Sequence, residues 1–205
     1  MKVNKIKKWS SRDTIVVGVI LILALVITFV SVNIATTPIG EGNTKDAQKA
    51  VAEYLKKETE DVQVLKMAWE GQVIFVLCKT GNSDEIYLVT LEQFAFFSGR
   101  YKVQGAFSTH APRYMDRLRY QGQFKGLPSH LSMMVVYGDN TNMRAHSYTL
   151  STGNVHNVGP DISQSMKDDY ILDIYYYNRS MQIFQLRVFD EHGNEIIQSN
   201  RHLLL

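Results

Sequence analysis

The sequence TIVVGVILILALVITFVSVNIA, residues Thr14 to Ala35, determines how the rest of this 205-residue chain is organised. It contains 22 consecutive residues without a charge. An α-helix that rises about 1.5 Å per residue would make this stretch about 33 Å long, enough to cross a hydrocarbon core of roughly 30 Å. We therefore expect a transmembrane helix at residues 14–35, with a short tail before it and a folded domain after it.

Basic residues are concentrated in front of this stretch. Residues 1–13 hold four lysines and one arginine against one aspartate, whereas the remainder holds 17 basic and 19 acidic residues. Basic residues beside a first hydrophobic helix stay on the cytoplasmic side. The pattern predicts a cytoplasmic tail at residues 1–13, a signal anchor at 14–35 and an extracytoplasmic C-terminal domain. Because the excess positive charge belongs to the tail, it does not indicate nucleic-acid binding.

A cleaved signal peptide is the competing interpretation of the apolar stretch. Cleaved signals have an apolar core of roughly 7–15 residues and small residues at the cleavage site. The run here is longer, and the candidate cleavage positions between Val30 and Ala35 include branched or bulky residues. These features favour an uncleaved single-pass anchor in a cell membrane.

An amphipathic helix and an antiparallel meander are predicted directly after the anchor. Residues 36–43 contain one proline and two glycines and are typical of a juxtamembrane linker. Asn43 suits an N-cap, and apolar residues at helical spacing predict a helix over residues 44–58. Four strand-like segments follow, at 62–69, 73–79, 85–91 and 94–107. Residues 44–108 are thus expected to form a helix packed on a sheet.

Residues 109–130 are expected to be an irregular basic and aromatic connection, with a short helical piece near residues 114–120. From Arg100 to His130 the chain has six basic residues and one acidic residue, interleaved with aromatic residues. Cations beside aromatic rings can bind phosphates, acidic polymers or stacked rings. The candidate partner surface consists of seven residues: Arg100, Lys102, Arg113, Tyr114, Arg117, Arg119 and Tyr120. In the alternative interpretation, the aromatic residues pack beneath a long loop and the cations are merely solvated.

Residues 131–205 are predicted to form the all-β half of the domain. Strand-like segments lie at 131–137, 143–150, 170–177 and 183–189, with a short one at 196–197. Residues 155–168 are expected to be a loop. The spacing suggests either a small antiparallel sandwich or a continuation of the first sheet. In the run Tyr175 to Tyr177, adjacent side chains point to opposite faces, so at least one tyrosine should face outward.

No motif indicates a particular reaction. The six histidines form no HExxH pattern, and the sequence lacks a GxSxG elbow, a P-loop and a GxGxxG turn. Cys78, the only cysteine, lies in the apolar run VIFVLC, which favours a buried and inert thiol. We therefore predict no catalytic, cofactor-binding or metal-binding residue. A pocket that joined His110 or His130 with a carboxylate would indicate an enzyme.

Three segments carry a resemblance in layout: GRYKVQGAFS (99–108), VVYGDN (135–140) and FDEHGNEI (189–196). With the short anchor before them, they resemble uncharacterised single-pass, membrane-anchored envelope proteins of Gram-positive bacteria. The resemblance implies a cell-envelope setting and carries over no catalytic residue. The first half of the domain is also similar to PepSY-type modules, which place a helix before an antiparallel sheet; this is an analogy of fold.

The expected function is that of a non-enzymatic, extracytoplasmic interaction or accessory module of the bacterial cell envelope. The expected partners are the membrane, crossed once with the N-terminus inside, and an envelope protein or an anionic wall polymer. Neither nucleic acid nor a cofactor is expected. The alternatives are an anchored hydrolase that acts on wall material, and an inhibitory or sensory PepSY-like module.

Overall fold

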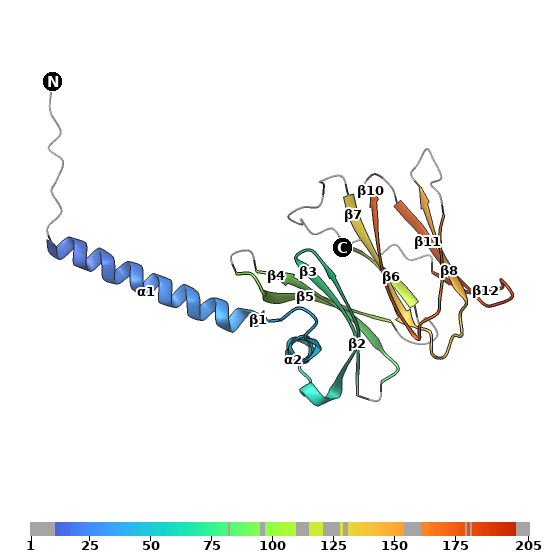
Figure 1. Ribbon diagram of the computed structural model, residues 1–205, viewed down its shortest axis with the longest axis horizontal. Coiled ribbons are helices and arrows are strands. Elements are labelled where there is room, and N and C mark those ends of the chain that lie inside the picture. The colour runs from blue at the N-terminus through green and yellow to red at the C-terminus, as the bar shows by residue number, and fades with distance from the viewer. Residues whose placement is uncertain are drawn as a thin grey trace, which may run out of the picture.

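The structure, a computed structural model, has one long N-terminal helix followed by a β-rich domain (Figure 1). It describes residues 11–81, 83–94, 97–109, 115–120, 128, 131–153, 161–178, 180 and 182–199. The helices are α1 (Ser11–Ala35), α2 (Thr44–Leu55) and the short 3₁₀ helix η1 (Thr59–Asp61). The predicted α+β class, an apolar helix followed by antiparallel sheets, is confirmed.

Twelve strands are described, and they form three antiparallel sheets. Sheet A has the order β1-β5-β4-β3-β2, sheet B the order β10-β7-β6, and sheet C the order β12-β11-β8-β9. The strands have the following bounds: β1 Thr37–Pro38, β2 Val62–Glu70, β3 Val73–Thr80, β4 Ile86–Gln93, β5 Arg100–Thr109, β6 Met115–Tyr120, β7 Leu131–Asp139, β8 Ser147–Gly153, β9 Ile162–Ser165, β10 Tyr170–Asn178, β11 Gln182–Phe189 and β12 Glu195–Ser199.

The layers follow the order α2, sheet A, sheet B, sheet C, with an apolar cluster between each pair of neighbours. Strand β3 is buried on both faces: Val76 faces α2, whereas Phe75 faces sheet B. Strand β7 is likewise covered twice, with Val135 toward sheet A and Val136 toward sheet C. Adjacent strand residues point to opposite faces, so a strand covered on both sides must be apolar at nearly every position. The runs VIFVLC and MMVVY meet this requirement.

Helix α1 contains the apolar stretch Thr14–Ala35, the only helix in the described part of the chain that is long and apolar enough to span a membrane. Its side chains are almost all exposed. Its few polar side chains bond back to the helix: Thr28 Oγ1 donates to Ala24 O at 2.8 Å, and Asn33 Nδ2 to Phe29 O at 2.8 Å. Such bonds satisfy polar groups that hydrocarbon cannot solvate.

The segment predicted as a linker, residues 36–43, is instead part of the fold. Thr37 and Pro38 form strand β1, which pairs with Tyr101 and Arg100 of β5. The ladder continues from Ile39 N to Gly99 O at 2.9 Å, and the Ile39 side chain is buried in the cluster beneath α2. Polar and glycine residues suggested a flexible connection, but backbone pairing and one buried isoleucine are enough to order it.

A side-chain bridge adds to this backbone connection between α1 and the domain. Arg100 Nη2 donates to Asn33 Oδ1, while the same carboxamide donates to the Phe29 carbonyl within the helix. Asn33 therefore links the last turns of α1 to the first residue of β5. Helix α1 and sheet A are thus joined by backbone pairing and by a side-chain hydrogen bond.

Helix α2 begins as predicted and ends three residues earlier. Asn43 Oδ1 accepts hydrogen bonds from the backbone N–H groups of Lys45 and Asp46, and Lys56 ends the helix in a left-handed conformation with φ 56°. Ala47 and Ala50 are buried against sheet A as expected. Tyr54, which the helical spacing also assigned to the buried face, is 46% exposed.

Several predicted boundaries in the β regions are wrong. Residues 115–120 form strand β6, not a helical piece, because all six pair with β7 and their side chains alternate between two packed faces. The expected loop at 155–168 contains the short edge strand β9 in its described part. The strand expected at 143–150 begins at Ser147, because Asn140 closes a loop by bonding both backbone groups of Ala145.

We predict that Asn33→Ala loosens the domain relative to the anchor, because it removes the acceptor of the Arg100 guanidinium. A hydrogen bond to a charged group contributes about 1.5–3 kcal/mol. Pulsed electron resonance between nitroxides at Ala24→Cys and Ser163→Cys should show a broader distance distribution in the variant. Thr28→Ala is the matched control, since the Thr28 hydroxyl bonds only within α1. Distance distributions of equal width in the Asn33→Ala and Thr28→Ala variants would contradict a role for the Asn33–Arg100 hydrogen bond.

Candidate functional site

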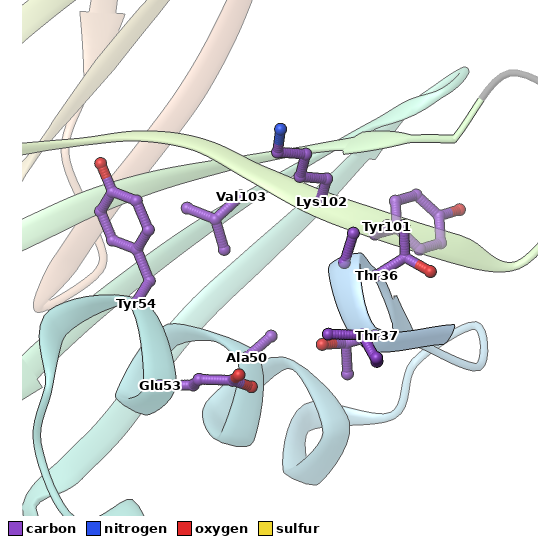
Figure 2. A pocket seen from close by; sticks show the side chains of 10 residues that line it. Thr36, Thr37, Ala50, Glu53, Tyr54, Tyr101, Lys102 and Val103 are labelled. Carbon is purple, nitrogen blue, oxygen red and sulfur yellow. The ribbon is translucent and has the colours of Figure 1, made fainter. Parts of the chain in front are cut away.

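A cleft of about 260 Å³ opens where the anchor helix meets the domain (Figure 2). Its walls come from the end of α1 with β1, from α2 and from β5. Ten residues line it: Ile34, Ala35, Thr36, Thr37, Ala50, Glu53, Tyr54, Tyr101, Lys102 and Val103. Ala50 and Val103 point toward each other across the space between α2 and β5, and Tyr54 stands at one side (Figure 2).

Small residues on α2 create this space. The face of α2 toward the sheet carries alanines at positions 47 and 50, so no large side chain fills the gap in front of Val103. Tyr101 forms the inner end and packs edge-to-face on Trp69, with ring centroids 5.7 Å apart. Burial, and next the charge of Glu41, raises the pKa of Tyr101, which therefore stays a neutral hydroxyl. The result is an apolar floor with a polar rim, the usual composition of a binding cleft.

The residue types in the cleft suit binding more than covalent catalysis. It offers the Glu53 carboxylate and several hydroxyls, while the ammonium group of Lys102 points away from α2 (Figure 2), and no histidine or cysteine lines it. A nucleophile needs an adjacent base or a lowered pKa to react. Within the described residues, no group of three or more His, Cys, Asp or Glu side chains could hold a metal ion.

The structure brings the described members of the predicted partner surface together only in part: Tyr120 of β6 bonds Glu92, which pairs with Lys102 of β5. Arg113 and Tyr114 lie outside the described residues, as do His110 and His130. Arg100 and Lys102 lie at the start of β5, beside the end of α1. Lys102 is exposed and borders the cleft, so one member of the predicted set belongs to the candidate site.

The other three members lie on β6, in the middle layer. Arg117 is only 5% exposed, and burial lowers its pKa while the nearby Asp116 opposes that shift. The guanidinium carbon of Arg119 lies 5.6 Å from the centroid of the Tyr177 ring. Tyr120 donates a hydrogen bond to Glu92 of sheet A and packs edge-to-face on Phe75. The expectation that Arg117 lies on a surface is therefore wrong; a partner role for the remaining residues stays a prediction.

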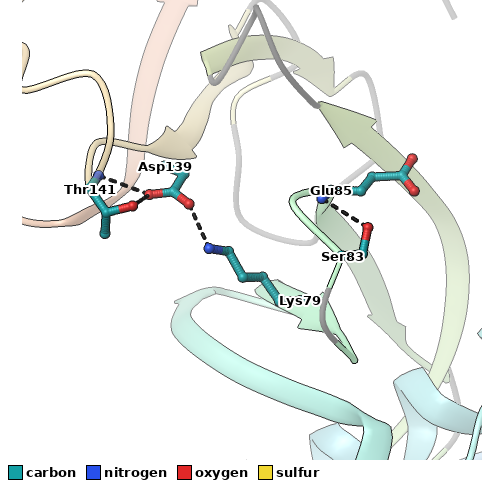
Figure 3. A network of polar contacts seen from close by, with 5 residues as sticks. All are labelled: Lys79, Ser83, Glu85, Asp139 and Thr141. Atoms are coloured by element: carbon teal, nitrogen blue, oxygen red, sulfur yellow. Dashed lines mark hydrogen bonds and ion pairs between the residues drawn. The ribbon is translucent and has the colours of Figure 1, made fainter.

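An ion pair links sheets A and B (Figure 3). Lys79 Nζ at the end of β3 lies 2.6 Å from Asp139 Oδ2 at the end of β7, and the Asp139 side chain is 3% exposed. Thr141 donates its backbone N–H and its hydroxyl to the other carboxylate oxygen. Burial alone would raise the pKa of Asp139, but the hydrogen bonds from Lys79 and Thr141 outweigh it and lower the pKa.

A tyrosine cluster lies between sheets B and C. The hydroxyl of Tyr148, a fully buried residue, donates to Asp173 Oδ2 at 2.6 Å and bonds the hydroxyl of Tyr175. Burial, followed by the hydrogen bond to Asp173, raises the pKa of Tyr148 far above its ordinary value. Tyr148 therefore keeps its proton and acts as a structural donor. Tyr176 is 48% exposed, which confirms the expected outward tyrosine.

Sequence reasoning missed the cleft because its lining comes from segments that look unrelated along the chain. The end of the anchor, the middle of an amphipathic helix and the start of a strand meet only after β1 pairs with β5. The one available signal was the pair of alanines facing the sheet.

The chain matches no protein-family model, no curated protein and no solved structure. The junction, the cleft and the sheet edges are therefore the features that bear on function.

We predict that Asp139→Asn lowers the free energy of unfolding by about 2–3 kcal/mol at neutral pH, because it leaves the Lys79 ammonium without its carboxylate. Since the folded pKa of Asp139 is lowered, the pair stabilises the protein above the unfolded pKa of about 3.9. This stabilisation is lost as the pH falls through the lower folded pKa. The difference between wild type and variant should thus shrink in acid, measured by denaturant titrations that follow Trp69 fluorescence.

Asp168→Asn is the control for this experiment. Asp168 also pairs with a lysine, at 2.6 Å from Lys66 Nζ, but its side chain is 63% exposed. Exposed pairs contribute little, so this variant should unfold much more like the wild type. An equal effect in the two variants would contradict the structural role of the buried pair.

Proposed function

We propose that this chain is a single-pass membrane protein of a bacterial cell envelope, with the β-rich domain outside the cytoplasm acting as a non-enzymatic interaction or accessory module. The observation that carries the proposal is the direct connection of α1 to sheet A, through β1 and the Asn33–Arg100 bond. A module connected in this way has a fixed orientation at the membrane. The basic tail in front of α1 supports a cytoplasmic N-terminus.

The open edge of sheet A beside the cleft suits one kind of ligand, an extended peptide. Strand β1 pairs with only the first two residues of the ten-residue strand β5. Beyond those pairs, the described residues supply no strand neighbour on the outer side of β5. An extended peptide can add to such an edge and place side chains in an adjacent pocket. The cleft borders the open part of the edge at Lys102 and Val103.

Between the two partner classes expected from the sequence, the cleft favours a protein. An anionic wall polymer needs a cationic groove, whereas this cleft has an apolar floor and the Glu53 carboxylate, and the Lys102 ammonium points away from α2 (Figure 2). The proposed partner is an extended segment of an envelope protein that pairs with β5 and places an apolar side chain between Ala50 and Val103. The anchored hydrolase and the inhibitory or sensory module stay predictions without a supporting observation among the described residues.

Topology is tested by cysteine labelling in intact cells. Cys78 is fully buried, and burial raises its pKa to about 12, so it should not react. A membrane-impermeant maleimide should label Ser163→Cys in intact cells, because Ser163 is exposed on β9. Lys5→Cys in the tail should be labelled only after permeabilisation. The reverse pattern, or release of a shortened soluble protein, would contradict the proposed anchor.

Partner binding is tested with a photo-crosslinking amino acid at Tyr54 of the full-length protein in its membrane. Tyr54 is exposed at the rim of the cleft, so irradiation should give a discrete protein adduct. The same probe at Gln164 on sheet C should give none. Lys102→Glu should reduce the adduct several-fold because Lys102 lines the cleft, whereas Lys57→Glu, after the end of α2, should not. Equal adducts from both probe positions would argue against the cleft.

A further inference from the structure

The turn between β4 and β5 carries two phenyl rings that lie outside the three apolar clusters formed by the described residues. The rings of Phe94 and Phe97 are stacked, with centroids 6.1 Å apart and an interplanar angle of 27°. Both side chains are partly exposed. The sequence predicted a strand from residue 94, but Phe97 N donates to Phe94 O at 3.0 Å and Phe94 N to Arg100 O at 2.7 Å, which makes a turn.

This turn lies beside the end of the anchor helix (Figure 1). The residue that follows it, Arg100, bonds to Asn33 in the last turns of α1. Gly99 within the turn has φ 75°, a conformation that glycine adopts without strain, and its carbonyl accepts the Ile39 N–H. Two consecutive residues, Gly99 and Arg100, thus hold the two phenyl rings next to the point where α1 ends.

The height of the turn follows from the length of α1, and this step rests on the proposed function. The apolar stretch ends at Ala35, two residues after Asn33. A helix of about 33 Å just covers a hydrocarbon core of roughly 30 Å, so Asn33 lies near the boundary between hydrocarbon and head groups. Because Arg100 contacts Asn33, the turn before Arg100 lies at the same boundary.

The chemistry of the turn fits that environment. Aromatic rings collect at membrane interfaces, and the two phenyl rings are partly exposed and belong to none of the three apolar clusters of the described residues. Lys102, two residues after Arg100 on the same strand, is exposed. Cations close to a membrane surface are attracted to anionic lipid head groups. Apolar rings and a nearby cation therefore face the same layer.

We propose that Phe94 and Phe97 insert at the head-group level of the membrane that α1 spans, with Lys102 directed toward anionic lipids. The turn is then a second membrane contact of the domain, separate from the anchor. Two contacts prevent rotation about α1 and hold the cleft at a fixed height and direction. A partner of the cleft would accordingly be met close to the membrane surface.

The depth of the turn is measured by a nitroxide at Ser98→Cys, an exposed position in the turn. Native Cys78 is buried and should stay unlabelled. The full-length protein is reconstituted in vesicles of phosphatidylcholine and phosphatidylglycerol. The label should collide several-fold more with oxygen, relative to a water-soluble nickel chelate, than a label at His192→Cys in the exposed β11–β12 turn. A Ser98→Cys label as water-accessible as the His192→Cys label would overturn the inference.

A third label separates this inference from the proposed function. Ala24→Cys lies in the middle of α1 and should be inaccessible to the chelate. If the Ala24→Cys label is buried in lipid while the Ser98→Cys label is in water, the second contact fails and the anchor stands. If the Ala24→Cys label is itself in water, the proposed anchor fails.

Serine substitutions test whether the phenyl rings hold the turn at the membrane. Phe94→Ser combined with Phe97→Ser should move the Ser98→Cys label toward water, while thermal unfolding stays near that of the parent. Phe189→Ser, at the end of β11 in sheet C, is the matched control and should leave the label depth unchanged. A label depth that survives the double substitution would show that α1 alone sets it, contrary to the proposal.

Discussion

The pairing of Thr37 and Pro38 with β5 is the constraint on which the functional geometry depends. The chain leaves a helix of membrane-spanning length and joins a sheet after a single intervening residue, Thr36. Ile39 then buries its side chain beneath α2, and Arg100 reaches back to Asn33. The cleft exists because of this arrangement, since its walls belong to the helix end, to α2 and to the strand that β1 joins.

The rest of the domain is stabilised by apolar packing on both faces of its middle layer, sheet B. Sheet B has three strands and packs against sheet A on one face and sheet C on the other. A strand in such a position must bury charged residues wherever its sequence contains them, and β6 contains two arginines. The long arginine stems supply apolar surface, and the Arg119 guanidinium is placed over the Tyr177 ring. The Lys79–Asp139 pair then joins sheets A and B at the strand ends.

The sequence predicted the elements that show a clear period, and it failed where pairing alone decides the structure. The apolar helix, the Asn43 cap and the doubly apolar β3 follow from local chemistry. Strand β6 does not, because MDRLRY looks solvated until its partner β7 is known. Of the two alternatives for the second half, the antiparallel sandwich agrees with the structure: sheets B and C pack face to face, and sheet A covers the other face of sheet B. Such stacking depends on contacts between distant segments.

The candidate site could be predicted only in part, because pairing between distant strands decides which of its residues lie together. Composition grouped residues 100–125 as one basic segment, but the fold distributes its cations over two environments. Arg100 and Lys102 lie beside the end of α1, and Lys102 also lines the rim of the cleft. Arg117 lies in the interior, 5% exposed, between packed sheets. Cations that are neighbours in sequence are therefore accessible together only where strand pairing leaves them at an edge, and here that edge is the end of β5 beside α1.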